Sequence, residues 1–153
     1  MPFSQTYLTP VDFKVVFEQS ACRQLLLDTS LTIVAVTDAY LKVTMTTREA
    51  IIGRYLFEVF PDNPDWGHAD GVPRVRQSLF KVMKSRMPYE MPIDRYDIPR
   101  PASEGGGFEE RHWRVNIWPI LDADRLVEWM VCQVEDVTSL VLAQRMPDAA
   151  RGP

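Results

Sequence analysis

Alternation of apolar and polar positions predicts β-strands in two separate parts of the chain. The first part contains two short β-rich runs, 23–27 and 32–37, and the Asp28-Thr29-Ser30 turn between them indicates a hairpin. The second part contains runs at 89–98, 108–120 and 126–137. A loop at 99–107 with three glycines and a turn at 122–124 separate these runs. We therefore expect five strands in two groups.

Helical spacing of apolar residues predicts a short helix before the first strand group. Thr9 can cap its free amides, Pro10 suits its first position, and Asp12 suits the positive end of the helix dipole. Phe13 and Phe17 then lie on one apolar stripe. This stripe has to pack against another surface, which is either the rest of this domain or a partner.

A block of helices is expected between the two strand groups. Asp38 caps a short helix through residue 41, and Thr46 and Glu49 have the spacing of a capping box for a helix that Gly53 ends. The segment 61–65 has the chemistry of a loop. A longer helix is expected from about 71 to 86 because its apolar residues lie on one face.

The order of these elements predicts the α+β class, with one five-stranded antiparallel sheet and helices packed on one face. After the last strand, Thr138 caps a short exit helix. The expected domain covers residues 10–142, including its N-terminal and exit helices. Residues 1–9 are expected to form a tail, and residues 143–153 a second tail that is disordered.

The last two strands carry apolar residues on both faces. Trp113, Val115 and Ile117 share one face of their strand, and Met130, Cys132 and Val134 share a face of the next strand with Asp136. We expect these faces to point inward, under the helices. Trp118 and Trp129 lie on the opposite faces among polar residues. The outer face is therefore expected to be covered by the N-terminal helix, by a second protomer, or by both.

Composition and charge exclude several classes of protein. A chain of 153 residues that is 46% hydrophobic and 25% charged suits one folded domain. The net charge of −4 argues against a nucleic-acid partner. No export signal and no apolar stretch long enough to span a bilayer is visible, and Cys22 and Cys132 lack a metal-ligand or redox spacing. We expect a cytoplasmic protein with no membrane segment.

Five fragments of the sequence, in the right order, resemble a PAS domain. They are residues 31–41, 47–54, 56–64, 95–98 together with 107–111, and 134–138, the last of which contains Glu135-Asp136-Val137-Thr138. The third and fourth fragments resemble a bacterial subgroup that is common in front of histidine kinase modules. The resemblance covers roughly residues 10–142. One departure is Thr37, where many members carry asparagine, although threonine can also cap a helix.

The resemblance implies a sensory and signal-transduction domain. Such domains have a core that responds to a ligand or cofactor, a sheet surface used for dimerisation, and an output helix that carries the signal to a histidine kinase or another partner. Asp136 and Thr138 match the Asp-x-Thr junction that leads into the output helix. Phe13, Phe17, Trp118 and Trp129 are the candidate dimer-interface residues. No kinase catalytic region is present in the sequence, so we expect no enzyme activity.

Two interpretations of the inward-facing residues remain open: they line a ligand cavity, or they form a solid core. The candidates for the cavity lining are Tyr40, Met91, Ile93, Trp113, Val115, Ile117, Met130, Cys132 and Val134. The sequence names no ligand for them.

A haem or flavin sensor is an alternative function. Some PAS domains bind haem through a histidine in the helical block, and His68 lies in that block, whereas His112 is expected on an outward strand face. Light-oxygen-voltage photosensors need a reactive cysteine in an Asn-Cys-Arg-Phe motif of the helical block. No cysteine occurs between Cys22 and Cys132, which excludes that group and leaves only non-covalent flavin. No other metal site is expected.

A small cavity enzyme is the second alternative. It would use Tyr40 or Tyr96 with an aspartate in an apolar pocket, where burial raises the pKa of a carboxyl group. The candidate aspartates are Asp94, Asp97 and Asp136. No glycine-rich phosphate loop, His-x-x-x-His pair or nucleophile elbow accompanies them. The enzyme hypothesis fails if all three carboxylates prove exposed or already paired.

Overall fold

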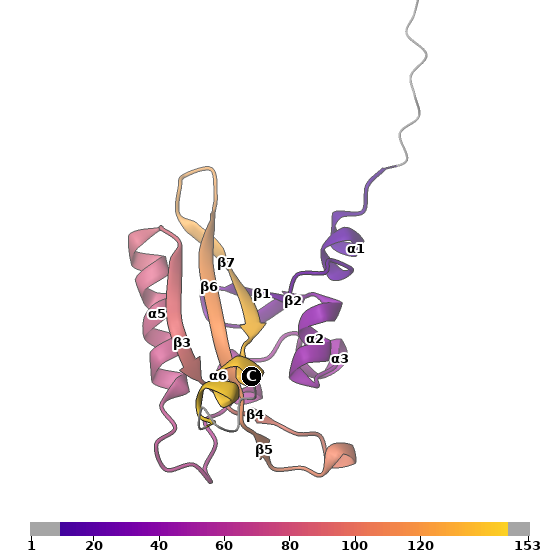
Figure 1. The fold of residues 1–153 in the computed structure, drawn as a ribbon. Helices are drawn as coiled ribbons and strands as arrows, with labels where there is room; N and C mark the ends of the chain where they lie inside the picture. The colour runs from indigo at the N-terminus through magenta and orange to yellow at the C-terminus, as the bar shows by residue number, and fades with distance from the viewer. Residues whose placement is uncertain (1–9, 147–153) are drawn as a thin grey trace, which may run out of the picture.

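A computed structural model describes residues 10–146, and Figure 1 shows its central antiparallel sheet. The sheet has five strands in the order β2-β1-β7-β6-β3. Their bounds are β1 Gln24–Asp28, β2 Ile33–Val36, β3 Tyr89–Arg95, β6 His112–Leu121 and β7 Val127–Asp136. A separate two-stranded ribbon joins β4 Ile98–Pro99 to β5 Phe108–Glu109. The predicted α+β class and five-stranded sheet are confirmed.

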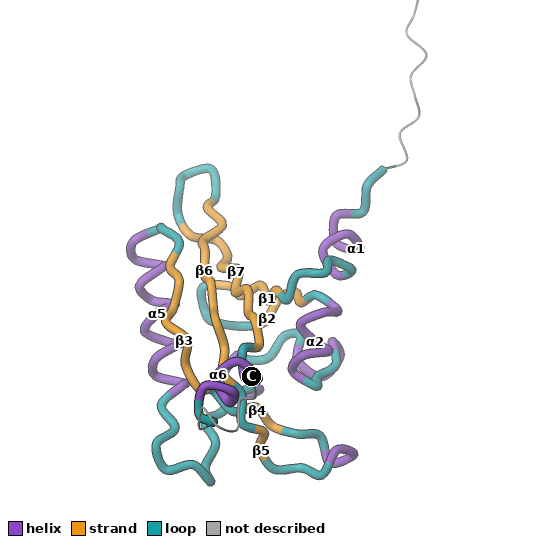
Figure 2. Tube along the Cα trace, in the orientation of Figure 1, coloured by secondary structure: helices purple, strands orange, loops and turns teal. Residues whose placement is uncertain are grey.

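Six α-helices accompany these strands within the described residues. They are α1 Phe13–Glu18, α2 Asp38–Thr44, α3 Arg48–Ile51, α4 Leu56–Val59, α5 Gly71–Ser85 and α6 Thr138–Gln144. A 3-10 turn, Ala102–Glu104, lies in the loop between β4 and β5. Figure 2 shows α5 running alongside β3, with α2 at the other end of the sheet near β1 and β2. None of the helices in residues 10–146 is long and apolar enough to cross a membrane.

The core forms where the inner face of the sheet meets the helices. Ile117 of β6 pairs with Cys132 of β7, and both side chains are buried. Leu79 and Val82 of α5 are also fully buried, because these apolar positions lie on one face of the helix. Alternation along the strands therefore places the inward residues of β6 and β7 as the sequence predicts.

Two predicted helix starts are displaced. The first helix is capped by Asp12, whose carboxylate accepts hydrogen bonds from the amides of Lys14 and Val15 at 3.1 and 3.3 Å. Thr9 lies outside the described residues. The second helix is capped by Thr37 instead of Asp38, because the Thr37 hydroxyl accepts the Tyr40 amide at 3.2 Å. Thr37 is fully buried, so this cap lies inside the protein.

The predicted capping box at Thr46 and Glu49 does not form. The N-cap residue of α3 is Thr47, which makes no side-chain cap, and the Thr46 hydroxyl bonds to the hydroxyl of Thr44 at 2.8 Å. The C-terminal end of α2 keeps Thr46 next to Thr44, because the Thr46 amide donates to the Leu41 carbonyl. Gly53 does follow the helix, with a positive φ of 82° that favours glycine.

Two predicted strands are interrupted. The segment 89–98 splits into β3 and β4 because Tyr96 and Asp97 turn toward the interior, and the segment 108–120 splits at Glu110 and Arg111. The carboxylate of Asp97 accepts the Arg111 amide at 3.3 Å, so the two interruptions face each other. Residues 1–9 and 147–153, expected to be tails, lie outside the described residues, but 143–144 belong to α6.

Candidate ligand cavity and exit junction

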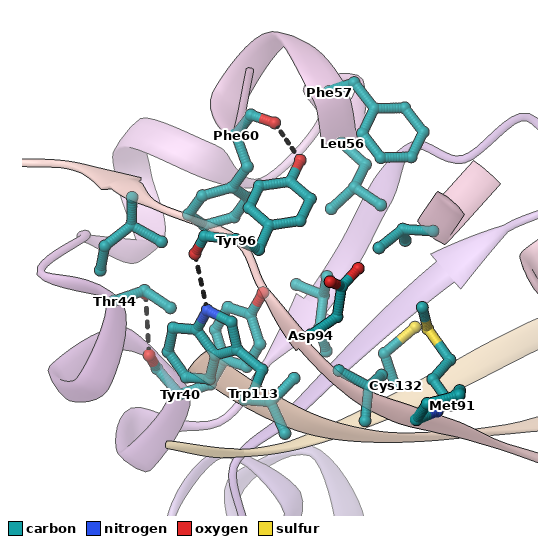
Figure 3. A pocket seen from close by; sticks show the side chains of 16 residues that line it. Tyr40, Thr44, Leu56, Phe57, Phe60, Met91, Asp94, Tyr96, Trp113 and Cys132 are labelled. Atoms are coloured by element: carbon teal, nitrogen blue, oxygen red, sulfur yellow. Dashed lines mark hydrogen bonds between the residues drawn. The ribbon is translucent and has the colours of Figure 1, made fainter. Parts of the chain in front are cut away.

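An apolar cavity of about 90 Å³ lies between the inner face of the sheet and the helices α2, α4 and α5. Figure 3 shows the side chains around it. Six of the residues predicted to line a cavity do so: Tyr40, Met91, Trp113, Val115, Cys132 and Val134. The remaining lining residues are Leu25, Thr44, Leu56, Phe57, Phe60, Val75, Pro92, Asp94, Tyr96 and Ile98. The inward faces of the strands therefore border an open space rather than a fully solid core.

Three predicted lining residues lie elsewhere. Ile117 and Met130 are fully buried in the core but do not border the cavity. Ile93 is 44% exposed, because the pairing of β3 with β6 shifts between Met91 and Asp94. A bulge of this kind reverses the alternation of side chains along a strand. Asp94 consequently borders the cavity in place of Ile93.

Residues of α4 and of the β3–β4 turn complete the wall, and the sequence argument selected only Tyr96 among them, as a candidate of the enzyme hypothesis. Leu56, Phe57 and Phe60 are all buried, and Phe60 packs edge-on against the ring of Tyr40. Leu56, Phe57 and Phe60 stand at positions i, i+1 and i+4, a spacing that indicates one face of a helix. Tyr96 and Ile98 lie there because the chain turns inward after β3, which strand periodicity does not foresee.

Hydrogen bonds fix most of the polar atoms in the cavity wall. The Trp113 indole donates to the carbonyl of Tyr96 at 2.8 Å, and the Tyr96 hydroxyl donates to the carbonyl of Phe60. The Thr44 hydroxyl donates to the Tyr40 carbonyl at 2.8 Å. These bonds join β6, the β3–β4 turn and α4, so they position one side of the wall as a unit.

The Tyr40 hydroxyl and the Cys132 thiol take no part in these hydrogen bonds. Burial first, and the proximity of Cys132 second, raise the pKa of Tyr40 far above its usual value. Burial raises the pKa of the Cys132 thiol to about 12. Both groups are therefore protonated at neutral pH, and Cys132 is not a thiolate nucleophile.

Each of the three aspartates considered for catalysis is already paired. Asp94 accepts the Arg95 amide at 2.9 Å and lies 3.3 Å from the Arg74 guanidinium. Asp97 is held by Arg95, and Asp136 by Arg111. The enzyme hypothesis required an unpaired carboxylate in the cavity, and none of these three carboxylates is unpaired.

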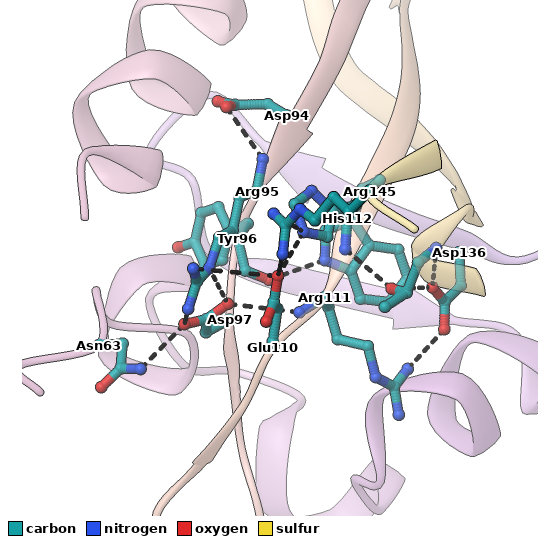
Figure 4. A network of polar contacts seen from close by, with 12 residues as sticks. Asn63, Asp94, Arg95, Tyr96, Asp97, Glu110, Arg111, His112, Asp136 and Arg145 are labelled. Carbon is teal, nitrogen blue, oxygen red and sulfur yellow. Dashed lines mark hydrogen bonds and ion pairs between the residues drawn. The ribbon is translucent and has the colours of Figure 1, made fainter. Parts of the chain in front are cut away.

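The buried carboxylate of Asp97 organises the base of the sheet, as Figure 4 shows. Arg95 donates two hydrogen bonds to it, both at 2.9 Å, and Asn63 donates a third at 2.9 Å. Burial opposes ionisation of Asp97, but these bonds outweigh it and lower its pKa. The Arg95 guanidinium also stacks on the Trp66 ring, 3.7 Å from its centroid. The loop before α5 is thereby tied to β3.

The exit junction connects the end of β7 to three other elements. Asp136 accepts the Thr138 amide at 3.0 Å and pairs with the Arg111 guanidinium at 2.8 Å. The Thr138 hydroxyl bonds to the Asp136 carboxylate and accepts the His112 amide at 2.9 Å. Thr138 therefore does not cap α6 with its own hydroxyl. Asp136 satisfies the first amide of α6, and Thr138 links the helix to β6.

Glu110 holds the far end of α6. Its carboxylate lies 2.8 Å from Arg145, which follows α6, and 2.8 Å from the His112 ring. The His112 hydrogen bond, with smaller contributions from Arg145 and Arg95, lowers the pKa of Glu110 although burial opposes this. His112 lies on the face of β6 opposite the inward Trp113, as expected, but it is buried there, with Glu110 and Arg145 beside its ring.

The remaining predicted residues lie away from the cavity. His68 is exposed in the loop before α5, so it cannot hold a haem iron inside the cavity. In residues 10–146, no three His, Cys, Asp or Glu side chains are grouped to hold a metal ion. Phe13 is 78% exposed, whereas Phe17, Trp118 and Trp129 are half-buried. The N-terminal helix therefore leaves part of its apolar surface uncovered.

A family model described as the PAS fold matches residues 17–142. No curated protein matches the chain. Among solved structures, the LOV protein of Rhodobacter sphaeroides is 14% identical with a TM-score of 0.61, over 82% of this chain and 64% of that one. This chain thus spans less than two thirds of that protein. Likeness at this identity concerns the fold alone.

Two further similar structures come from Vibrio species. A sensory box sensor histidine kinase from Vibrio cholerae is 15% identical with a TM-score of 0.55, covering 82% of this chain and 89% of that one. The PAS domain of nitrogen regulation protein NR(II) from Vibrio parahaemolyticus is 11% identical with a TM-score of 0.59. The match covers 83% of this chain and 99% of that domain's chain.

Proposed function

Because the chain belongs to the PAS fold family, a family of sensory and signalling domains, we propose that it is the input domain of a signalling system. A small molecule in the cavity biases the geometry of the sheet, and the exit helix α6 carries the change to a histidine kinase or another output partner. The domain itself performs no catalysis. The similar fold of the sensor histidine kinase structure from Vibrio cholerae supports this choice of partner.

One observation carries the proposal: the cavity and the exit junction share a strand face. Cys132 and Val134 border the cavity, and Asp136 follows at the next position on the same face of β7. Asp136 in turn accepts the first amide of α6. A ligand that moves the cavity side of β7 therefore moves the carboxylate that binds the first amide of α6.

A second connection runs through α2. Arg111 pairs with Asp136 and also donates to the carbonyl of Val43 at 2.9 Å. Val43 lies on α2, and this helix supplies Tyr40 and Thr44 to the cavity wall. A displacement of α2 by a ligand thus reaches the same carboxylate from the helical side.

Dimerisation is part of the proposal, with the outer sheet face and α1 as the interface. Phe13 exposes most of its side chain, and Ile120 is 37% exposed beside the half-buried Trp118 and Trp129. Ile120 and Trp129 are paired across β6 and β7, so they present one continuous apolar surface. A second protomer that packs there would bury surface that the single chain leaves in water.

A cytoplasmic location completes the proposal. Cys22 is an exposed free thiol and Cys132 a buried one, and neither takes part in a disulfide. Free exposed thiols suit a reducing compartment, which in bacteria is the cytoplasm.

Native mass spectrometry of the protein purified from its own cells tests ligand and assembly together. We expect the mass of a dimer with a small molecule that is lost on denaturation. Protein refolded without ligand is the matched control and should give the dimer mass alone. A monomer with no additional mass, even at the highest protein concentration that can be sprayed, would contradict the proposal.

A further inference from the structure

The chemistry of the cavity limits what it can bind. Its volume of about 90 Å³ is smaller than a cavity that holds benzene, for which about 150 Å³ has been measured in another protein. Without movement of the wall, the occupant has on the order of five non-hydrogen atoms. Large flat cofactors do not fit within this volume.

The wall excludes charged occupants. Of the residues that border the cavity, only Asp94 carries a charge, and its carboxylate is already bonded to the Arg95 amide and paired with Arg74. An anionic ligand would meet this carboxylate and no cation in the wall. A cationic ligand would have to displace Arg74. In a largely apolar cavity, an unpaired charge is strongly destabilised.

One hydrogen-bond donor in the wall has no partner. Tyr40 is only 6% exposed, and among residues 10–146 its hydroxyl makes no hydrogen bond. Among the described residues, Arg48 Nε is the only fully enclosed side-chain nitrogen or oxygen without a hydrogen-bond partner. The Tyr40 hydroxyl also lacks a partner, so it is not fully enclosed by protein atoms. The Tyr40 hydroxyl therefore opens onto the cavity that its side chain borders.

Water is a poor partner for this hydroxyl. A buried water molecule typically makes about three hydrogen bonds. The Cys132 thiol is the other unbonded polar group in the wall, and it is a weak donor and acceptor. An organic oxygen needs one bond and brings apolar surface for the rest of the cavity.

Resting on the proposed function, we propose that the ligand is a small uncharged molecule, mostly hydrocarbon, with one acceptor oxygen that the Tyr40 hydroxyl binds. Carbonyl compounds and ethers of about four to five non-hydrogen atoms have this chemistry. Tyr40 is then the residue that distinguishes such a ligand from a hydrocarbon of the same shape.

The test uses two ligands of one shape and two tyrosine variants. Cyclobutanone and methylenecyclobutane differ in a single position, an oxygen against a CH₂ group, and propionate serves as an anion of similar size. Each is titrated into the ¹⁵N-labelled protein and followed by the amide signals of cavity-lining residues. We expect cyclobutanone to bind about threefold to tenfold more tightly than methylenecyclobutane, the effect of one neutral hydrogen bond. Tyr40→Phe should abolish that preference without weakening the binding of methylenecyclobutane.

Thermal unfolding gives a second readout that does not depend on ligand. Tyr40→Phe should leave the melting temperature unchanged or raise it, because the hydroxyl it removes is unbonded. Tyr96→Phe is the matched control and should lower it, because the Tyr96 hydroxyl donates to the Phe60 carbonyl. An equal loss in both variants would show that the Tyr40 hydroxyl is bonded within the protein, and would overturn the inference.

The binding outcomes separate this inference from the proposed function. If both cyclic ligands bind equally and Tyr40→Phe has no effect, or if propionate binds best, the assigned ligand class is wrong while the cavity remains a binding site. If none of the three ligands perturbs the cavity signals, ligand sensing in this cavity fails as well.

Discussion

At the scale of single residues, two tyrosines in the same wall have different roles. The Tyr96 hydroxyl donates to the Phe60 carbonyl, so it ties the β3–β4 turn to the end of α4. The Tyr40 hydroxyl has no such partner among residues 10–146. Tyr96 therefore holds the cavity wall in place, whereas the Tyr40 hydroxyl is available to bond to a ligand in the cavity.

Tyr96→Phe should lower the free energy of unfolding by about 1 to 2 kcal/mol, because it leaves the carbonyl of the buried Phe60, at the end of α4, without its donor. Urea unfolding followed by tryptophan fluorescence measures this. A variant as stable as the wild type would show that the bond contributes nothing to the fold.

Asp97→Asn should lower the free energy of unfolding by about 2 to 3 kcal/mol at pH 7, because Arg95 loses a buried ionic partner. The folded-state pKa of Asp97 lies below its usual value, so its stabilisation is complete above pH about 4 and is lost as the pH falls through the folded-state pKa. The difference from the wild type should thus shrink toward pH 2.

Unfolding experiments at pH 7, 5 and 3 check this pH dependence. Asp65→Asn, an exposed carboxylate in the loop that also holds Asn63, is the control and should have little effect. A difference between Asp97→Asn and the wild type that grows as the pH falls would contradict the assignment.

At the scale of elements, close packing at Gly71 sets the position of α5. A Cβ atom at this residue would lie 2.9 Å from Tyr96 Cγ, well inside normal contact. The first turn of α5 therefore packs directly on the tyrosine ring that forms part of the cavity wall. The glycine is explained by this contact, since its backbone conformation does not require one.

Gly71→Ala should destabilise the protein by about 1 to 3 kcal/mol through overpacking, although alanine favours helix formation by about 1 kcal/mol over glycine. Gly67→Ala is the matched control in the preceding loop, where a Cβ meets no atom within 4 Å. Thermal unfolding of the two variants compares them. Equal stability would mean that Tyr96 moves aside freely.

The elements themselves followed from sequence because each has a strong local pattern, such as the single apolar face of α5. Their ends were harder, since neighbouring residues compete for one cap: Thr37 displaced Asp38, and Asp12 displaced Thr9. The position of Ile93 could not be foreseen, because a bulge depends on the pairing partner rather than on the strand's own sequence.

At the scale of the whole molecule, the site was predictable in part for the same reason. Strand alternation identified the sheet side of the cavity, including Trp113 and Cys132. The helical side, with Phe57 and Phe60, depends on how α4 packs on the sheet, and no local pattern determines that. The pairing of Arg111 with Asp136 joins residues 25 positions apart, so it too required the folded chain.

Phe13→Ser should weaken the proposed dimer about tenfold, because an exposed aromatic side chain in an interface often dominates its affinity. Sedimentation velocity over a range of concentrations measures the dissociation constant. Phe80→Ser, on the outer surface of α5 and 50% exposed, is the matched control and should not change it. If both variants dimerise like the wild type, α1 is not part of the interface.

Hydrogen exchange of the α6 amides after the cavity is filled tests the coupling between cavity and exit helix most directly. Cys132→Leu adds side-chain volume to the cavity, and Met130→Leu changes a buried neighbour on the same strand face without entering it. We predict that Cys132→Leu changes α6 exchange rates by at least about threefold, while Met130→Leu leaves them as in the wild type. Identical α6 exchange in all three folded proteins would contradict the account.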